Sequence, residues 1–241
     1  MGRIVPLVVI LLTLAAPALQ AQPGGDTRGV VEVEGATYAE LDEGTGLLTL
    51  RGNPVMVRRG RMTLRAPAIV YDTKQRILRA AGGAVFTDPT LTMEAPEATV
   101  WIDEDRLLAT AGVAAAQGQG ADAIRLRAAR LEVFGGDRRL VATGTVELVS
   151  SDATMTGDRV EAALARDELS AEGNARIVRE DIEGRAPRVL VRRGEGLAVL
   201  SGGAVVRQGP NEARAETITV DLRRRRFTAT GRASLVLQPS R

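Results

Sequence analysis

The sequence predicts an all-β protein: a folded-over antiparallel β-jellyroll, or β-taco, of about fourteen strands. Three observations lead to this prediction. Apolar and polar residues alternate along most of the chain, a two-strand pattern recurs about every 30 residues, and the polar stretches between strands are too short for helices. A two-strand unit cannot bury its own apolar face, so we expect the units to stack.

The chain begins with a segment that resembles a secretory signal. Arg3 precedes an apolar run over residues 4–19, and small residues follow it. We therefore expect residues 1–21 to be a signal peptide and residues 22–28 to be a flexible lead-in. The alternative is an uncleaved inner-membrane anchor, although the run is shorter than the roughly 20 residues of a spanning helix.

The first type of strand recurs seven times around a glycine. Large apolar residues lie toward its ends, and Gly or Ala occupies its middle. The anchors are 29 to 32 residues apart: Gly52, Gly82, Gly112, Gly144, Gly173, Gly202 and Gly231. Because glycine in a strand marks a bend or a close approach, this small waist predicts either the crease of a folded sheet or a channel.

The second type of strand lies between copies of the first. Its small anchors are Ala66, Ala95, Ala128, Gly157, Ala186 and Ala215, with Gly35 as an early half-copy. After each anchor the next inward residue comes three positions later instead of two. Such a step predicts a β-bulge or bend in every strand of this type. We expect residues 29–238 to form a single domain.

Composition argues against most enzyme classes. The 241 residues contain no Cys and no His, which removes disulfides, thiolate metal sites and the usual general base. Acidic residues at 103–105 and 167–168 fall in predicted turns and are interpreted as solvated. We predict no enzymatic activity, no cofactor and no metal. A net charge of +2 and 2% aromatic residues also argue against nucleic-acid binding.

The inward residues of the folded sheet have two interpretations, a dry core or an apolar groove for acyl chains. In the groove, each buried CH₂ would contribute roughly 0.8 kcal/mol. The predicted lining residues are Leu50, Met56, Leu64, Ile69, Leu78, Phe86, Met93, Val100, Leu108, Leu126, Leu131, Leu140, Val146, Leu148, Met155, Val160, Ile177, Val189, Leu200, Val206, Ile218, Phe227 and Leu235.

An open stack leaves an unpaired strand at each end, and such edges pair with other chains. We predict partner contacts at Val31 and Val33 of the first strand and at Leu235 and Leu237 of the last. Head-to-tail addition would extend the groove from one protomer to the next. The alternative is that the lead-in or the C-terminal tail covers these edges. The run Arg223–Arg226 is either a solvated turn or a grip for lipid phosphates.

Two segments, MTLRAPAIVYDTKQRILRAAGGAVF and RLVATGTVELVSSDATMTGDRVEAAL, resemble the OstA-like family. This periplasmic lipopolysaccharide-transport family includes a bridge protein, its inner-membrane-anchored partner and the periplasmic domain of the outer-membrane translocon. Tyr71 and Asp72 match the family's turn, and the Leu-Ala-Gly frames match its strands. Proline at 67, 96 and 187 replaces the family's aspartate, which survives only at Asp158. The resemblance covers about residues 29–237.

The resemblance implies a periplasmic carrier that shields acyl chains of lipopolysaccharide, or of a related glycolipid or phospholipid. It also implies edge-to-edge assembly with the anchored inner-membrane jellyroll, with the outer-membrane translocon jellyroll, or with further copies in a head-to-tail homo-oligomer. The alternative is a structural β-solenoid scaffold or adhesin-type spacer with no lipid ligand. A solenoid would stack its strands in parallel register, whereas a jellyroll pairs them antiparallel.

Overall fold

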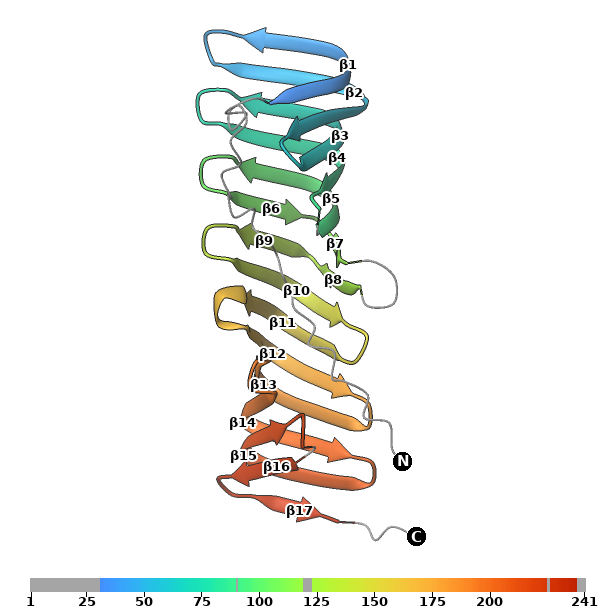
Figure 1. Ribbon diagram of the computed structural model, residues 1–241, viewed down its shortest axis with the longest axis vertical. Helices are drawn as coiled ribbons and strands as arrows, with labels where there is room; N and C mark the ends of the chain where they lie inside the picture. The colour runs from blue at the N-terminus through green and yellow to red at the C-terminus, as the bar shows by residue number, and fades with distance from the viewer. Residues whose placement is uncertain (1–30, 90, 119–122, 225, 238–241) are drawn as a thin grey trace, which may run out of the picture.

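The computed structural model describes residues 31–89, 91–118, 123–224 and 226–237. They form one seventeen-stranded sheet that rises as a long stack, with β1 at one end and β17 at the other (Figure 1). The predicted signal peptide and lead-in lie outside the described residues. Within these ranges, no helix has the length and apolar character needed to cross a membrane.

The strands follow one another along the stack almost in chain order. They are β1 (Glu32–Asp42), β2 (Leu47–Arg59), β3 (Met62–Asp72), β4 (Ile77–Thr87), β5 (Leu91–Trp101), β6 (Arg106–Thr110), β7 (Val113–Gln117), β8 (Ile124–Ala128), β9 (Arg130–Phe134), β10 (Arg139–Val149), β11 (Thr154–Ala163), β12 (Glu168–Arg179), β13 (Ile182–Arg192), β14 (Leu197–Gln208), β15 (Asn211–Asp221), β16 (Arg226–Thr230) and β17 (Ser234–Val236). A short 3-10 helix, Leu164–Arg166, follows β11.

Three pairs of these strands are halves of one longer strand. Both β6 and β7 pair with β5, both β8 and β9 pair with β10, and both β16 and β17 pair with β15. Counting each pair once turns the seventeen strands into the fourteen that the repeat predicts. The interruptions are local breaks at the bend.

Strand pairing confirms the predicted fold class. Every pairing within the described sheet is antiparallel, from β1 with β2 to β15 with β17. A β-solenoid needs parallel register between successive coils, so the solenoid alternative is wrong for this fold. The sheet folds over itself because each strand is bent near its middle, where the register shifts.

The bend has a defined backbone conformation. At Gly82 and Gly83 two consecutive residues have φ of 85° and 103°. The same left-handed pair recurs at Ala111–Gly112, Gly144–Thr145, Gly173–Asn174, Gly202–Gly203 and Gly231–Arg232. The left-handed conformation costs a residue with a side chain roughly 1–2 kcal/mol, which explains why glycine dominates these positions. The glycine waist is therefore the crease of the folded sheet.

The crease divides the sheet into two walls. The first wall consists of the strand halves joined by the turns at 43–46, 102–105, 135–138 and 193–196. The second wall consists of the halves joined by the turns at 60–61, 180–181 and 209–210. Inward side chains of both walls meet between them. Ile69, Met93, Leu131, Leu200 and Ile218 are all 0% exposed there. Burial of such side chains stabilises the fold by roughly 1.5–3 kcal/mol each.

Two of the predicted inward residues face outward instead. In β2 the crease holds three unpaired residues, 52–54, against one in β3, so Val55 and Val57 point inward and Met56 does not. In the third copy the left-handed pair is Ala111–Gly112, one residue earlier than the predicted alignment. Leu107 is buried there, and the half-exposed Leu108 lies on the outer face.

Candidate functional site

The remaining predicted lining residues lie on the inward face. Seventeen are buried: Leu50, Leu64, Ile69, Leu78, Phe86, Met93, Leu126, Leu131, Leu140, Val146, Met155, Val160, Ile177, Val189, Leu200, Val206 and Ile218. Val100, Leu148 and Phe227 are partly buried and pack against that core. Leu235 is 54% exposed because, among the described residues, β17 pairs on one side only, with β15. The inward face is thus a filled core near the crease. Space between the walls lies toward their free rims, opposite the crease, and we call this opening the mouth.

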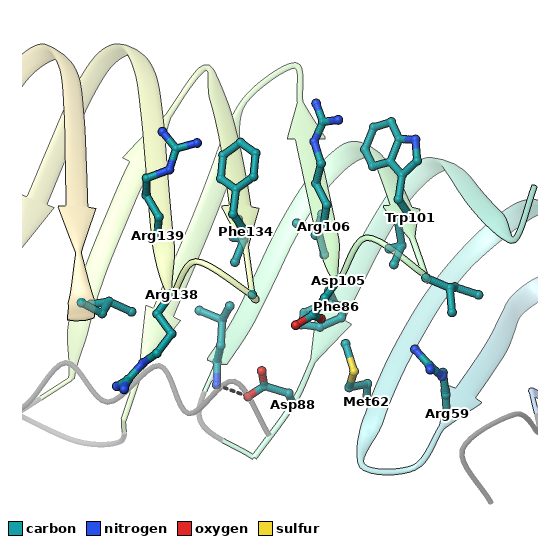
Figure 2. Close-up of a pocket in the computed structure, with 17 residues that line it drawn as sticks. Arg59, Met62, Phe86, Asp88, Trp101, Asp105, Arg106, Phe134, Arg138 and Arg139 are labelled. Carbon is teal, nitrogen blue, oxygen red and sulfur yellow. Dashed lines mark hydrogen bonds between the residues drawn. The ribbon is translucent and has the colours of Figure 1, made fainter. Parts of the chain in front are cut away.

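A hollow at the mouth lies between the rims of the two walls in the middle of the stack (Figure 2). It is open to solvent, with a volume of about 730 Å³. Its apolar surface comes from both walls: Met62, Phe86, Leu91, Val100, Ile102, Leu107, Val133 and Leu164. An apolar surface of this kind suits a ligand with hydrocarbon chains.

Charged residues surround this apolar floor. Arg59 and Asp88 lie on the rim of the second wall, and Asp105, Arg138 and Arg139 lie on the rim of the first. With Arg106, the lining contains four arginines and two aspartates. Guanidinium groups bind phosphate oxygens in bidentate geometry. The mouth therefore combines a hydrocarbon-binding floor with one guanidinium group on each rim, Arg59 and Arg138, which suits an anionic amphiphile. Arg106 and Arg139 pair instead with Glu132 and Glu161.

A second hollow, of about 460 Å³, lies deeper between the walls and shares Leu91 with the mouth. Most of its lining is aliphatic, including Leu126, Leu140, Leu148 and Val160. Gln117 contributes the polar exception, and its buried Oε1 has no hydrogen-bond partner among the described residues. The apolar space thus continues from the mouth toward the interior in the middle of the stack.

The outer face of the first wall carries an aromatic–arginine ladder beside the mouth. We define it as Trp101, Arg106, Phe134 and Arg139, which lie opposite one another on β5, β6, β9 and β10 and stand in a row in Figure 2. The Arg106 guanidinium carbon lies 4.4 Å from the Trp101 ring centre, and that of Arg139 lies 4.2 Å from the Phe134 ring centre. Cation–π contacts of this length stabilise neighbouring strands.

A carboxylate fixes one arginine of the ladder, Arg106. Glu132 accepts hydrogen bonds from Arg106 and lies 3.3 Å from the Nη2 of Arg130. Burial alone would raise the pKa of Glu132, but the hydrogen bonds from these two arginines outweigh it and hold its pKa below the usual value. The ladder therefore braces the part of the stack where β6, β7, β8 and β9 are only five residues long.

Sequence reasoning missed several residues of the mouth. Ile102 lies in a turn and Leu164 begins the short 3-10 helix, and at both places the alternation stops. Leu107 would follow from aligning the Ala111–Gly112 pair with Gly82–Gly83, because both pairs are followed by a buried residue. Arg59 and Arg138 have no local signal that distinguishes them from other turn arginines.

The predicted turn positions hold for Asp103, Glu104, Asp105, Asp167, Arg223 and Arg224. Glu168 instead begins β12, and Arg226 begins β16. Asp103 pairs with Arg76 at 2.9 Å, and Asp167 pairs with Arg193 at 2.6 Å. In the arginine run, Arg223 donates a hydrogen bond to the Gly194 carbonyl. These contacts join each turn to the next along the first wall.

The two edge strands are exposed. Val33 is 38% exposed on β1, and Leu235 and Leu237 are 54% and 65% exposed at the other end, whereas Val31 packs partly against the core. The segments predicted to cover these edges lie outside the described residues. The ends also differ in charge: residues 31–46 contain five acidic and no basic residues, and residues 222–237 contain five arginines and no acidic residue.

The sequence matches a family of transport proteins. Residues 92–226 match a family described as "LptA/(LptD N-terminal domain) LPS transport protein". Among solved structures, LptH of Pseudomonas aeruginosa, the LptA homologous periplasmic component of the lipopolysaccharide transport device, is 19% identical. That match covers 50% of this chain and 100% of LptH, with a TM-score of 0.47. No curated protein matches the chain.

Proposed function

Because the chain belongs to the LptA/LptD N-terminal family of lipopolysaccharide transport proteins, we propose that it is a periplasmic bridge that carries lipopolysaccharide or a related glycolipid. The observation that supports this most is the mouth, where an apolar floor lies between arginine-bearing rims. Acyl chains would leave water against the floor, with roughly 0.8 kcal/mol for each buried CH₂. Phosphates would face Arg59 and Arg138.

The apolar part of this proposal is tested by photo-crosslinking with purified lipopolysaccharide. A photoreactive residue replaces Leu140, which lines the deeper hollow, or Glu172, which lies on the outer face of β12. We expect an adduct from position 140 and none from position 172. Adducts only from position 172, or from neither position, would overturn the carrier and leave a spacer without a lipid ligand.

The charged part is tested by binding measurements with Arg138→Gln. One lost charge-assisted contact is expected to weaken binding of the phosphorylated lipid roughly five- to tenfold. Binding of the same lipid without phosphates should not change. Arg79→Gln is the matched control, because Arg79 is exposed on the outer face of β4. An equal loss with both variants would mean that the effect is one of net charge only.

We also propose that neighbouring jellyrolls join edge to edge, in register with the existing sheet. One row of paired residues runs through the whole stack from Asp42, opposite Leu47, to Arg226, opposite Asp221. A second copy added in the same register would set its Asp42 opposite Arg226 and its Leu41 beside Phe227. Opposite charges across strands favour this pairing, and the exposed Leu41 and Leu235 would become buried.

Mixing two charge-reversed proteins tests this assembly. Asp42 accepts hydrogen bonds from the backbone of Gly44 and Thr45 in its own turn, so the better position is Glu40, the next acid on the same face. In this register Glu40 lies opposite Thr228 and diagonally across from Arg226, within reach of its long side chain. Glu40→Arg and Arg226→Glu should each assemble less than the natural chain in sedimentation experiments. An equimolar mixture should recover dimers. Recovery without mixing, or no assembly of the natural chain with itself or with partner jellyrolls, would contradict the proposal.

A further inference from the structure

The mouth is bridged in the C-terminal third of the stack. Arg179 ends β12 on the rim of the second wall, and its side chain is 19% exposed. Its Nη1 lies 3.5 Å from the carbonyl oxygen of Leu222, in the turn after β15 on the first wall. Its Nη2 lies 3.4 Å from Asp152, in the turn before β11. One guanidinium anchored on the second wall thus reaches the rim of the first.

The walls also meet below this bridge. A Cβ built on Gly184 of the second wall would lie 2.6 Å from Cδ2 of Leu200 on the first wall. The Leu200 side chain therefore reaches the backbone of the opposite wall, and it is 0% exposed. Gly184 is not in the left-handed region, so close packing explains its lack of a side chain: a Cβ would meet Leu200 first and then Cγ2 of Ile177 at 3.1 Å.

This contact reverses the arrangement of four other repeats. Four pairs of residues sixteen positions apart carry the large side chain first and alanine second: Leu64 and Ala80, Met93 and Ala109, Leu126 and Ala142, Met155 and Ala171. The fifth pair, Gly184 and Leu200, carries the small residue first. The bulky group has moved from the second wall to the first, next to the crease.

From these contacts we propose that Arg179 and Leu200 form a gate in the space between the two walls. This proposal rests on the proposed lipid transport. The gate lies between the open hollows in the middle of the stack and the C-terminal edge. Lipid bound in the middle reaches that edge only when the two walls separate at Arg179. Both contacts of Arg179 are long, and both partners lie on turns, so the bridge can open without disturbing strand pairing.

The gate is tested by holding it shut in the full-length mature protein. The chain contains no cysteine, so Arg179→Cys with Leu222→Cys creates the only two thiols, which a short bismaleimide can join across the mouth. A photoreactive phenylalanine analogue replaces Phe86 in the mouth hollow or Phe227 near the C-terminal edge. Purified lipopolysaccharide is the probe, and unmodified double-cysteine protein is the control.

Joining the thiols is expected to lower the adduct at position 227 by about fivefold or more, since a contact of this kind shifts an opening equilibrium by that order. The adduct at position 86 should not change. Equal adducts at position 227 with and without the linker would overturn the gate while leaving transport intact. No adduct at position 86 in either protein would instead overturn the proposed function.

A second variant separates the gate from general stability. Gly184→Met with Leu200→Ala restores the large-then-small order of the other repeats and keeps the buried volume. It should raise the adduct at position 227 relative to the natural chain with no loss of adduct at position 86. A lowered adduct at position 227 in this variant would contradict the assignment of Leu200 to the gate.

Discussion

The middle of the stack, β5 to β10, and its C-terminal third, β12 to β15, are built from the same repeat. They differ in how well side chains fill the space between the two walls. In the middle, two long strands are broken into five-residue halves, and hollows of about 730 and 460 Å³ remain. In the C-terminal third the strands are continuous, and Leu200 and Arg179 connect the walls. The comparison teaches that the repeat specifies strand pairing, while side-chain volume decides whether a section is open.

The two regions are also braced differently. In the middle, the aromatic–arginine ladder binds four strands together on the outer face. In the C-terminal third, Glu168, Glu183 and Glu212 each pair with two arginines, as Glu183 does with Arg176 and Arg185. In the middle, contacts on the outer face stabilise walls that have hollows between them. In the C-terminal third, the two walls stabilise each other through direct contacts.

The largest expected effect is the difference in unfolding free energy lost when a leucine is truncated in a filled section of the stack and in a hollow one. Leu200→Ala should reduce the free energy of unfolding by about 2–5 kcal/mol, because a fully buried leucine leaves a cavity. Leu148→Ala, at the wall of the deeper hollow, should cost less than about 2 kcal/mol because Leu148 is only partly buried. Urea unfolding measures both.

The control for this prediction is the double variant Leu200→Ala with Gly184→Met. It should recover about 1–3 kcal/mol of the loss because it restores buried volume. Equal losses for Leu148→Ala and Leu200→Ala would remove the difference between the two sections. A double variant less stable than Leu200→Ala would show that the second wall cannot accept the side chain.

A smaller effect is expected at the creases. Gly203 has a φ of 95° with no atom within 4 Å of a built Cβ, so Gly203→Ala should cost about 1–2 kcal/mol from backbone strain alone. Ala111 in the middle already bears such strain at a φ of 68°. Ala111→Gly should therefore stabilise the protein by roughly 0.5–1 kcal/mol after the entropy cost of glycine.

Thermal unfolding midpoints check the two crease variants. Gly136→Ala serves as the control, because Gly136 lies in a turn with ordinary φ and open space around it; it should be neutral or slightly stabilising. If Ala111→Gly lowered the midpoint, the left-handed pair would not be the source of strain at the middle crease.

The smallest expected effect is the dependence of stability on pH. The pKa of Glu132 in the middle is lowered in the folded state, so its contribution is complete above its unfolded pKa and is lost as the pH falls through the folded value. Solvent screens such pairs, so we expect a contribution within about 1 kcal/mol. Glu132→Gln should flatten the acid limb of unfolding free energy measured from pH 7 to pH 3.

Glu183 provides the matched position in the C-terminal third. Hydrogen bonds from Arg176 and Arg185 lower its pKa as well, so Glu183→Gln should change the acid limb in the same direction. An acid limb unchanged by Glu132→Gln but flattened by Glu183→Gln would show that the ladder holds without its carboxylate.

Much of this molecule was predictable because it follows from local periodicity. Alternation identified the strands, and the period of about 30 residues identified the repeat. The three-residue step correctly predicted the bend in the second type of strand, as at Ala66 and Ile69, both of which are buried. Predictions were wrong where a crease had an unusual length or lacked glycine at its first position, which displaced Met56 and Leu108 to the outer face.

The amino-acid sequence by itself determined the fold class, the antiparallel repeat, most of the inward residues and the opposite charges of the two ends. Only the tertiary structure decided where the walls stand apart and where they touch. It also decided which turn arginines meet at the mouth and that Arg179 reaches Leu222, 43 residues away. The physical reason is that strand pattern acts over a few residues, whereas the gap between the walls depends on the fit of side chains from both, and no local pattern encodes that fit.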